Sequence, residues 1–210
     1  MKPRVLFVAG STGATGQVLI RLADAQGLSV VPHVRPQSAT KAPARAAVLD
    51  LADQAELVKA LAECTTVVQL IGTMKKRFAS GDTYETSDIG TTRQLVEAAK
   101  EAGVDHFLLL SSVGAGRPVG AYLRAKARAE ALVKESGLPF TVFRPSALEG
   151  GERRPVPGLR ALTRALGLSA LQPITLEELS RAMLRAARDR SPLGAVLEGR
   201  ALWELVRRAG

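Results

Sequence analysis

The sequence is poor in the side chains that hold metal ions or form covalent cross-links. Its 210 residues include one cysteine, Cys64, and two histidines, His33 and His106. A single cysteine excludes a disulfide within the chain and leaves no zinc cluster. Metal catalysis would have almost no ligands to work with, so we expect no metal site.

Long apolar runs are also missing. Hydrophobic residues make up 46% of the chain, but no run approaches the roughly 18 apolar residues of a membrane-spanning helix. A strand-like run lies at the start of the sequence, and we expect no secretory or transit segment. We therefore expect a cytoplasmic protein with no membrane partner, and the length suits one domain with a sizeable core.

Positive charge outweighs negative charge, mostly in the second half of the chain. The net charge is +9. From Arg117 onward the chain has 17 basic and 9 acidic residues, a net charge of +8. Such a surface could bind nucleic acid, a phosphorylated cofactor or an acidic substrate. Aromatic residues, which stack on bases, make up only 4%. We interpret the excess as solvated helix faces and expect no nucleic-acid partner.

Strand-like and helical segments alternate along the first two thirds of the chain. Strands are expected at Val5–Ala9, Leu28–Val34, Ala46–Leu49, Thr66–Ile71, His106–Ser111 and Pro139–Arg144, and helices at Thr15–Gln26, Gln54–Cys64, Ile89–Ala102 and Ala121–Ser136. Alternation with short connections is typical of a parallel sheet covered by helices on both faces. The sequence therefore predicts an α/β fold with a doubly wound parallel sheet, the Rossmann fold.

The pattern changes after Arg144. Helices are expected at Leu159–Leu166, Leu176–Arg190 and Leu202–Arg208, and a short strand at Ala195–Leu197. Thr175 and Glu178 form a capping-box pattern at the start of the second of these helices. We expect a single domain, with a cofactor-binding core (1–145) and a small C-terminal substrate-side extension (146–210). The extension is expected to fold over the carboxyl edge of the sheet, where ligands bind in such folds.

Three glycines lie three residues apart directly after the first strand. They belong to the segment Gly10-Ser11-Thr12-Gly13-Ala14-Thr15-Gly16, here called the glycine loop. Gly10 permits a sharp turn, Gly13 lets the backbone approach an anion, and Gly16 lets the helix pack close to the sheet. The helix N-terminus offers unpaired N–H groups and a positive dipole end. The loop is therefore a candidate pyrophosphate site; a loop without a ligand is the alternative.

The residues after the second and third strands bear on the choice of cofactor. An acidic residue near the end of the second strand binds the ribose 2′-OH of NAD, whereas an arginine suits the 2′-phosphate of NADP. No Asp or Glu lies between Asp24 and Asp50, and Arg35 follows the second strand. We expect NADP(H) rather than NAD(H), with a solvated loop arginine as the alternative. Asp50 and Leu51 are expected beside the adenine ring.

A second cluster follows the fifth strand. Ser111 and Ser112 end the strand, and Tyr122 and Lys126 lie four residues apart, which puts them on one face of a helix. A tyrosine acts as an acid or base near neutral pH only if its pKa of about 10 is lowered, and a nearby ammonium lowers it. The lysine could also hold a nicotinamide ribose, and a serine could polarise a substrate carbonyl. An amphipathic helix with a half-buried tyrosine is the alternative.

With these motifs together, the sequence resembles the short-chain dehydrogenase/reductases. It is most similar to their atypical, NAD(P)H-binding branch, the NmrA-like and Tat-interacting, metastasis-suppressor oxidoreductase-like proteins. The resemblance is carried by the glycine loop, Ile71-Gly72-Thr73, Gly103-Val104-Asp105-His106-Phe107, Ser111-Ser112-Val113-Gly114-Ala115, Tyr122-Leu123-Arg124-Ala125-Lys126 and Phe143-Arg144-Pro145. It extends into the tail and covers nearly the whole chain.

The resemblance implies a Ser, Tyr and Lys catalytic set and a defined set of cofactor contacts. The catalytic residues would be Ser111 or Ser112, Tyr122 and Lys126. The cofactor contacts would be the glycine loop, Arg35, Leu70, Ile71, Gly72 and Pro145, together with Tyr122 and Lys126. In extended relatives the active serine often lies one place further on, where this chain has Val113, so the choice of serine stays open.

Several functions are compatible with this resemblance. We expect an NADP(H)-dependent oxidoreductase that transfers a hydride to or from a small carbonyl or enone substrate, with Tyr-Lys acid/base chemistry. A non-catalytic NADP(H)-binding regulator that acts through protein contacts is one alternative. A sugar-nucleotide epimerase or dehydratase is another. A monomer and a homodimer are equally compatible with the sequence.

Other chemically active side chains have simpler interpretations. Asp88 is expected to cap the helix that follows it, with no chemistry. The run Lys75-Lys76-Arg77 could meet a cofactor phosphate or an acidic substrate, or be solvated. We expect both histidines to be structural and Trp203 to anchor the last helix.

Overall fold

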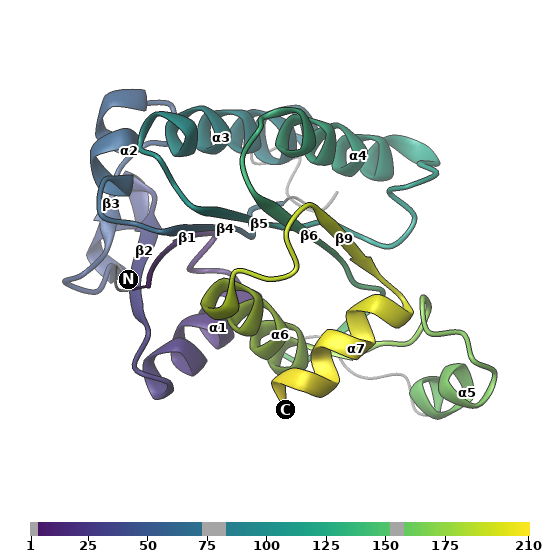
Figure 1. Ribbon diagram of the computed structural model, residues 1–210. Helices are drawn as coiled ribbons and strands as arrows, with labels where there is room; N and C mark the ends of the chain where they lie inside the picture. The colour runs from purple at the N-terminus through teal and green to yellow at the C-terminus, as the bar shows by residue number, and fades with distance from the viewer. Residues whose placement is uncertain (1–3, 73–82, 152–157) are drawn as a thin grey trace.

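A seven-stranded parallel sheet forms the centre of the molecule. The computed structural model describes residues 4–72, 83–151 and 158–210 (Figure 1). The strands are β1 (Val5–Ala9), β2 (Ser29–Val34), β3 (Ala47–Val48), β4 (Thr66–Gln69), β5 (His106–Leu110), β6 (Phe140–Arg144) and β9 (Ala195–Glu198), and β7 (Leu148–Glu149) pairs separately with β8 (Ile174–Thr175). The order β3-β2-β1-β4-β5-β6-β9 reverses direction between β1 and β4, which confirms the doubly wound fold and places ligands at that point.

Helices cover both faces of this sheet (Figure 1). One layer contains α2 (Gln54–Leu61), α3 (Thr91–Glu101) and α4 (Gly120–Glu135), and the other contains α1 (Ala14–Ala25), α6 (Leu176–Asp189) and α7 (Arg200–Ala209). A short helix, α5 (Leu159–Ala165), lies apart from both layers, and a π-helical turn (Glu85–Gly90) precedes α3. Within the described residues, no helix has both the length and the apolar character needed to cross a membrane.

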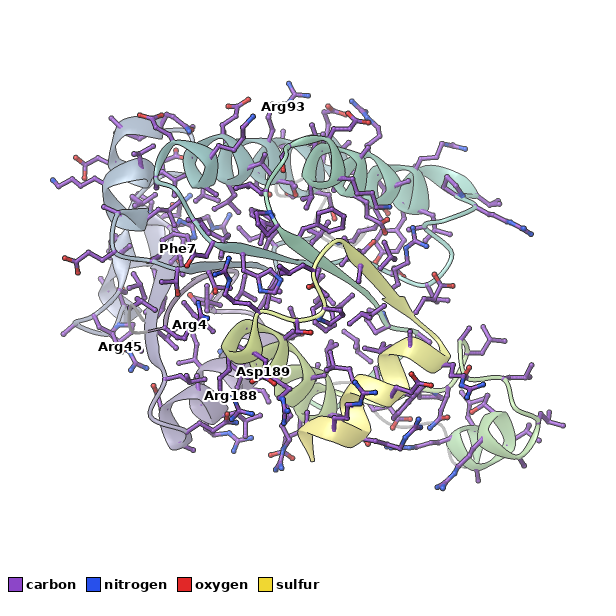
Figure 2. The ribbon with its side chains drawn as sticks, in the orientation of Figure 1. Arg4, Phe7, Arg45, Arg93, Arg188 and Asp189 are labelled. Carbon is purple, nitrogen blue, oxygen red and sulfur yellow. The ribbon has the colours of Figure 1, made fainter. Side chains whose placement is uncertain are left out.

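Apolar strands explain why the sheet is buried on both faces. Successive residues of a strand point to opposite sides. Phe7 and Phe107 pack with the layer of α2, α3 and α4, whereas Leu6 and Leu108 pack with the layer of α1, α6 and α7. All four side chains are fully buried. Figure 2 shows Phe7 among the strands and Arg93 projecting outward from α3.

The C-terminal third completes the central fold as well as reaching the ligand edge. β9 pairs with β6, and α6 packs on α1, where Leu19 and Met183 belong to one buried cluster. The predicted capping box opens α6 and is confirmed, because the side chains of Thr175 and Glu178 each bond the other residue's backbone N–H. The apolar runs of β9, α6 and α7 thus extend the sheet and its second layer, and the substrate-side role of this third stays a prediction.

Candidate active site

The glycine loop joins β1 to α1 at the carboxyl edge of the sheet. Gly10 has a φ of 89°, in the left-handed region, and the Gly13 N–H donates to the Gly10 carbonyl across 3.1 Å. A Cβ on Gly16 would overlap that carbonyl oxygen and lie 2.8 Å from the Cα of Ser11. Glycine at position 16 therefore lets α1 begin this close to β1.

The first turn of α1 is open to an anion. No described side chain caps the helix, and its first turn contains no acidic residue. Thr12, Gly13 and Ala14 are exposed, whereas Thr15 is half-buried. Because the first N–H groups of a helix have no partner within it, they and the positive dipole end face outward here. These residues fit a cofactor that carries a pyrophosphate.

The ends of β2 and β3 are tied to the same loop. The buried Ser11 hydroxyl donates to the His33 carbonyl at 2.5 Å, and His33 Nε2 lies 3.0 Å from the Leu49 carbonyl. Burial lowers the pKa of His33, so the neutral ring donates this bond. Arg35 lies two residues further along and is exposed. The loop and Arg35 therefore share one edge of the sheet.

The remaining predicted cofactor contacts after β3 and β4 lie at the same edge of the sheet as the glycine loop. Asp50 is exposed and accepts a hydrogen bond from the Ala52 N–H at 3.0 Å, whereas Leu51 is buried. A Cβ on Gly10 would lie 3.0 Å from the Leu70 carbonyl carbon and 3.1 Å from the Ile71 nitrogen. The end of β4 thus passes directly against the glycine loop. The predicted cluster Lys75-Lys76-Arg77 lies outside the described residues.

The predicted Tyr–Lys pair lies on α4, and a carboxylate holds the lysine. Lys126 Nζ is 2.8 Å from Asp88 Oδ1, and only 8% and 0% of the two side chains are exposed. Nζ also donates to the Leu110 carbonyl at 3.3 Å. The half-exposed Tyr122 ring has its centroid 5.9 Å from Nζ and 5.8 Å from that of Tyr84.

The prediction that Asp88 caps the following helix is wrong, because Gly90 is the N-cap of α3. Asp88 lies inside the π-helical turn Glu85–Gly90, and α3 begins only at Thr91. Such turns occur frequently at functional sites. Gly72 covers the ion pair, because a Cβ there would lie 2.8 Å from Lys126 Nζ and 3.1 Å from Asp88 Oδ1. The π-helical turn and the lack of a side chain at Gly72 together leave room for the ion pair between Lys126 and Asp88.

The two candidate serines have different surroundings. Ser111 is buried, and its hydroxyl donates to Glu130 Oε1 at 2.6 Å. Ser112 is half-buried, and its hydroxyl makes a longer bond of 3.3 Å to the Val113 carbonyl. The Val113 N–H in turn donates to the Pro145 carbonyl at 2.9 Å, which places Pro145 beside the serines. Ser111 therefore faces a buried network, and Ser112 is the more accessible of the two.

That network is centred on Glu130, which sequence reasoning missed. Its carboxylate is 1% exposed and accepts bonds from Arg144 at 2.6 and 2.7 Å and from Lys134 at 2.8 Å. Arg144 also pairs with Glu198 at 3.0 Å. Burial opposes ionisation of Glu130, but hydrogen bonds from Arg144, Lys134 and Ser111 outweigh it and hold its pKa below the ordinary value. The network ties α4 to the ends of β5, β6 and β9.

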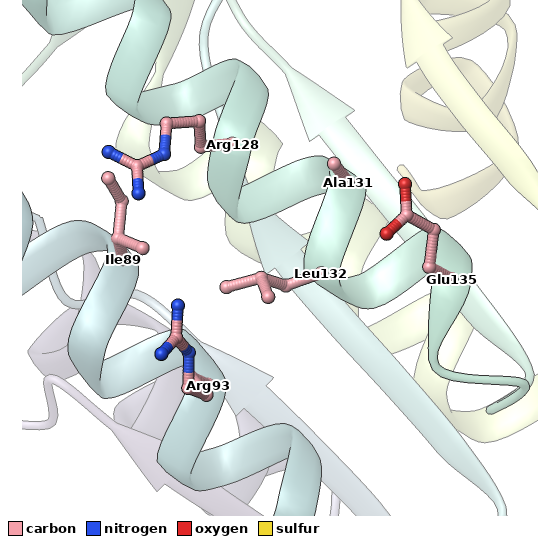
Figure 3. Close-up of a pocket in the computed structure, with 6 residues that line it drawn as sticks. All are labelled: Ile89, Arg93, Arg128, Ala131, Leu132 and Glu135. Carbon is pink, nitrogen blue, oxygen red and sulfur yellow. The ribbon is translucent and has the colours of Figure 1, made fainter.

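A shallow pocket of about 190 Å³ lies away from this edge, between α3 and α4. It is lined by Ile89, Arg93, Arg128, Ala131, Leu132 and Glu135 (Figure 3). Arg93 comes from α3 and Arg128 from α4, and the latter pairs with Glu85 at 2.7 Å. None of the predicted catalytic or cofactor-binding residues lines this pocket, so it is separate from the candidate active site.

Sequence comparisons give a consistent set of relatives. A family described as NAD(P)H-binding matches residues 10–190. The chain is similar to protein TIC 62, chloroplastic, of Oryza sativa subsp. japonica, with 30% identity over 69% of this chain and 35% of that protein. It is also similar to protein FMP52, mitochondrial, of Debaryomyces hansenii, with 27% identity over 70% and 68% of the two chains. A third relative is the divinyl chlorophyllide a 8-vinyl-reductase, chloroplastic, of Oryza sativa subsp. indica, with 26% identity over 68% and 39%. The chain thus spans about a third of the rice TIC 62 protein.

Two solved structures of similar fold have NAD in their descriptions. A putative NAD-dependent epimerase/dehydratase from Bacillus halodurans superposes with a TM-score of 0.74 at 21% identity, over 98% of this chain and 99% of that one. The Bordetella bronchiseptica enzyme WbmH, in complex with NAD+, superposes with a TM-score of 0.67 at 19% identity, over 97% and 79%. At these identities the likeness establishes the shared fold.

Proposed function

The chain belongs to the NAD(P)H-binding family, and from this premise we propose that it is an NADP(H)-dependent oxidoreductase of the atypical short-chain dehydrogenase/reductase type. One observation carries the proposal: Lys126, held by Asp88, lies beside Tyr122 at the same sheet edge as the open glycine loop. The substrate class that we propose is a small carbonyl or enone. The vinyl reductase among the relatives supports reduction of a carbon–carbon double bond.

The cofactor would extend along the carboxyl edge from β2 to α4. We assign its pyrophosphate to the first turn of α1, its 2′-phosphate to Arg35, and its adenine to the surface beside Asp50 and Leu51. The nicotinamide end would lie near Gly72, which packs against Lys126, and near Pro145, whose carbonyl accepts from the Val113 N–H. An exposed arginine is suited to a phosphate because its guanidinium donates several hydrogen bonds in one plane.

The side chains divide the remaining chemistry between them. The bound cofactor would supply or accept the hydride. Tyr122 would give a proton to the substrate oxygen or carbon, or remove one in the reverse direction. Lys126 would stabilise negative charge on the tyrosine oxygen and contact the ribose. Ser112, rather than the network-bound Ser111, would orient the substrate carbonyl, because its hydroxyl is more accessible and makes the weaker internal bond.

Two alternatives each have one observation in their favour. The Asp88 carboxylate neutralises the charge of Lys126, which favours a non-catalytic NADP(H)-binding regulator that acts through protein contacts. The structural neighbours include a UDP-glucuronic acid 4-epimerase from Bacillus cereus in complex with UDP-glucuronic acid and NAD, which favours a sugar-nucleotide reaction. The relatives are named as chloroplastic or mitochondrial proteins, and a cytoplasmic location of this chain stays a prediction. Both a monomer and a homodimer stay open.

Calorimetric titration with NADPH and NADH tests the cofactor assignment. We expect NADPH to bind more tightly, and Arg35→Ala to weaken NADPH by about tenfold or more while changing NADH little, because a charge-assisted phosphate contact is lost. Arg45→Ala is a matched control, since Arg45 is equally charged but bonds both Asp24 oxygens at 2.7 Å. Equal losses in the two variants, or NADH binding more tightly than NADPH, would refute the assignment.

Turnover then tests the chemistry. A panel of small aldehydes, ketones and enones is assayed by NADPH absorbance with the wild type and Tyr122→Phe. Loss of turnover with unchanged NADPH affinity supports the tyrosine as the proton donor, whereas full activity in the variant contradicts it. NADPH binding without turnover on any substrate of the panel would favour the regulator.

A further inference from the structure

Exposed leucines gather on one short segment of the chain. In the described part of the molecule, eight large hydrophobic side chains are exposed, and four of them lie within ten residues. These are Leu162, Leu166, Leu168 and Leu171, with exposed fractions of 57%, 61%, 45% and 55%. Leu162 and Leu166 are four residues apart at the end of α5 and so lie on one side of it. We call these four residues the α5 leucine patch.

The backbone beneath the patch is attached firmly to the rest of the protein. The Trp203 indole N–H donates to the Ser169 carbonyl at 3.1 Å. The Arg160 guanidinium lies 5.4 Å from the centroid of the same indole ring and pairs with Glu178. Thr163 is buried, with 5% exposed. The segment that carries the leucines is therefore held in place by contacts with Trp203 and Glu178. The four leucines themselves stay exposed on its outer side.

Positive charge exceeds negative charge in the part of the chain that contains the patch. In residues 158–176, the charged residues are Arg160 and Arg164. Residues 158–210 contain nine arginines and five acidic residues, which gives 9 − 5 = +4 of the chain's net +9. A second copy of this chain would carry the same excess and be repelled, whereas an anionic surface would be attracted. Arg164 is exposed on α5 itself.

We propose that the α5 leucine patch docks this protein onto the surface of an anionic lipid bilayer. The leucines would enter the boundary between headgroups and acyl chains, and the surrounding arginines would contact lipid phosphates. Figure 1 shows α5 projecting beyond the two helix layers. A projecting apolar turn suits lipid, which rearranges around it, whereas a folded protein would need a matching groove. The absence of a spanning helix led us to expect no membrane partner, but surface docking requires no span.

Vesicle flotation with the full chain tests this docking. The probes are vesicles of pure phosphatidylcholine and vesicles with about one third phosphatidylglycerol. We expect binding to the anionic vesicles and little to the neutral ones. The double variant Leu162→Ser/Leu166→Ser should bind about 30-fold more weakly, because each leucine would transfer about half of its surface into hydrocarbon. Arg164→Gln should weaken binding about fivefold.

Matched variants separate the patch from general effects. Leu193→Ser removes a leucine that is 47% exposed in the loop before β9, and it should bind like the wild type. Leu168→Ser/Leu171→Ser removes the other half of the patch and should also weaken binding. Trp203 fluorescence and NADPH titration of each variant report folding and keep this test independent of the proposed reaction.

Several results would overturn the proposal. Equal vesicle binding by the wild type and both double variants would show that the leucines play no part. Failure of the wild type to bind anionic vesicles would exclude docking on lipid. Self-association of the wild type that the double variants abolish, without vesicle binding, would assign the patch to a second copy. An effect of the variants on KM alone would assign it to the substrate.

Discussion

Acidification below neutral pH should destabilise this protein, and we predict that His106 causes much of the loss. His106 is fully buried on β5, with its Nε2 at 2.9 Å from Thr141 Oγ1. The Thr141 hydroxyl donates its own proton to the Pro192 carbonyl, so His106 Nε2 must carry a hydrogen and donate. Among the described residues, Nδ1 has no hydrogen-bond partner. A second proton would therefore be placed on a buried nitrogen with no acceptor.

The size of the effect follows from the shift in pKa. Burial, followed by the positive charges of Arg190 and Arg4, lowers the pKa of His106 from 6.5 to about 4. In the unfolded chain His106 therefore binds a proton near pH 6.5, whereas in the folded chain it binds this proton only near pH 4. Stability falls as the pH decreases through this window, by about 2.5 kcal/mol between about pH 7.5 and about pH 4.5. The lowered pKa of His33 acts in the same direction.

Urea unfolding at several pH values measures this loss. Trp203 is the only tryptophan in the sequence and is 92% buried, with 8% exposed, so its fluorescence reports unfolding. His106→Gln keeps a donor directed at Thr141 but does not titrate. The difference in unfolding free energy between the wild type and the variant isolates His106 from His33 and the carboxylates. We expect that difference to change by about 2.5 kcal/mol over the same pH range. Parallel curves for the two proteins would refute the reasoning.

Three further predictions concern residues of the loop, the network and the cap, all measured by urea unfolding. Gly16→Ala should cost about 2 kcal/mol or more and weaken NADPH binding, because the added Cβ overlaps the Gly10 carbonyl; a variant of normal stability would contradict the close approach. Glu130→Gln should cost about 3 kcal/mol, because it leaves the mostly buried Arg144 without its main counter-charge, and a loss below about 1 kcal/mol would be the opposing result. Thr175→Ala should cost about 1 kcal/mol through loss of the α6 cap, and no change would mean that the cap contributes nothing.

Local patterns were enough to predict the fold and the glycine loop. The strand β1 was predicted with its observed bounds, and the capping box at Thr175 marked the start of α6 correctly. These features depend on residues that are neighbours in the sequence. The glycine spacing likewise constrains one turn and the helix that follows it.

The partners of the site residues could not be predicted in this way. Asp88 lies 38 positions before Lys126, and an Asp near a helix start is usually a cap. Glu130 falls on a helix rich in Arg and Ala, where a glutamate is usually solvated. One signal was present: Glu130 directly follows Ala129 and lies three residues before Val133, both apolar, and Arg144 ends a buried strand, so both charged side chains needed partners.

The packing of α6 on α1 has a consequence for how the chain assembles. The apolar side of α1, which includes Leu19, is covered by residues such as Met183 from a helix some 160 positions later. Until that later segment has been synthesised, the helix that follows the glycine loop has an uncovered apolar side. A nascent or prematurely terminated chain would therefore expose an apolar surface next to the glycine loop. The glycine loop and α1 should therefore reach their final packing only after α6 has been synthesised.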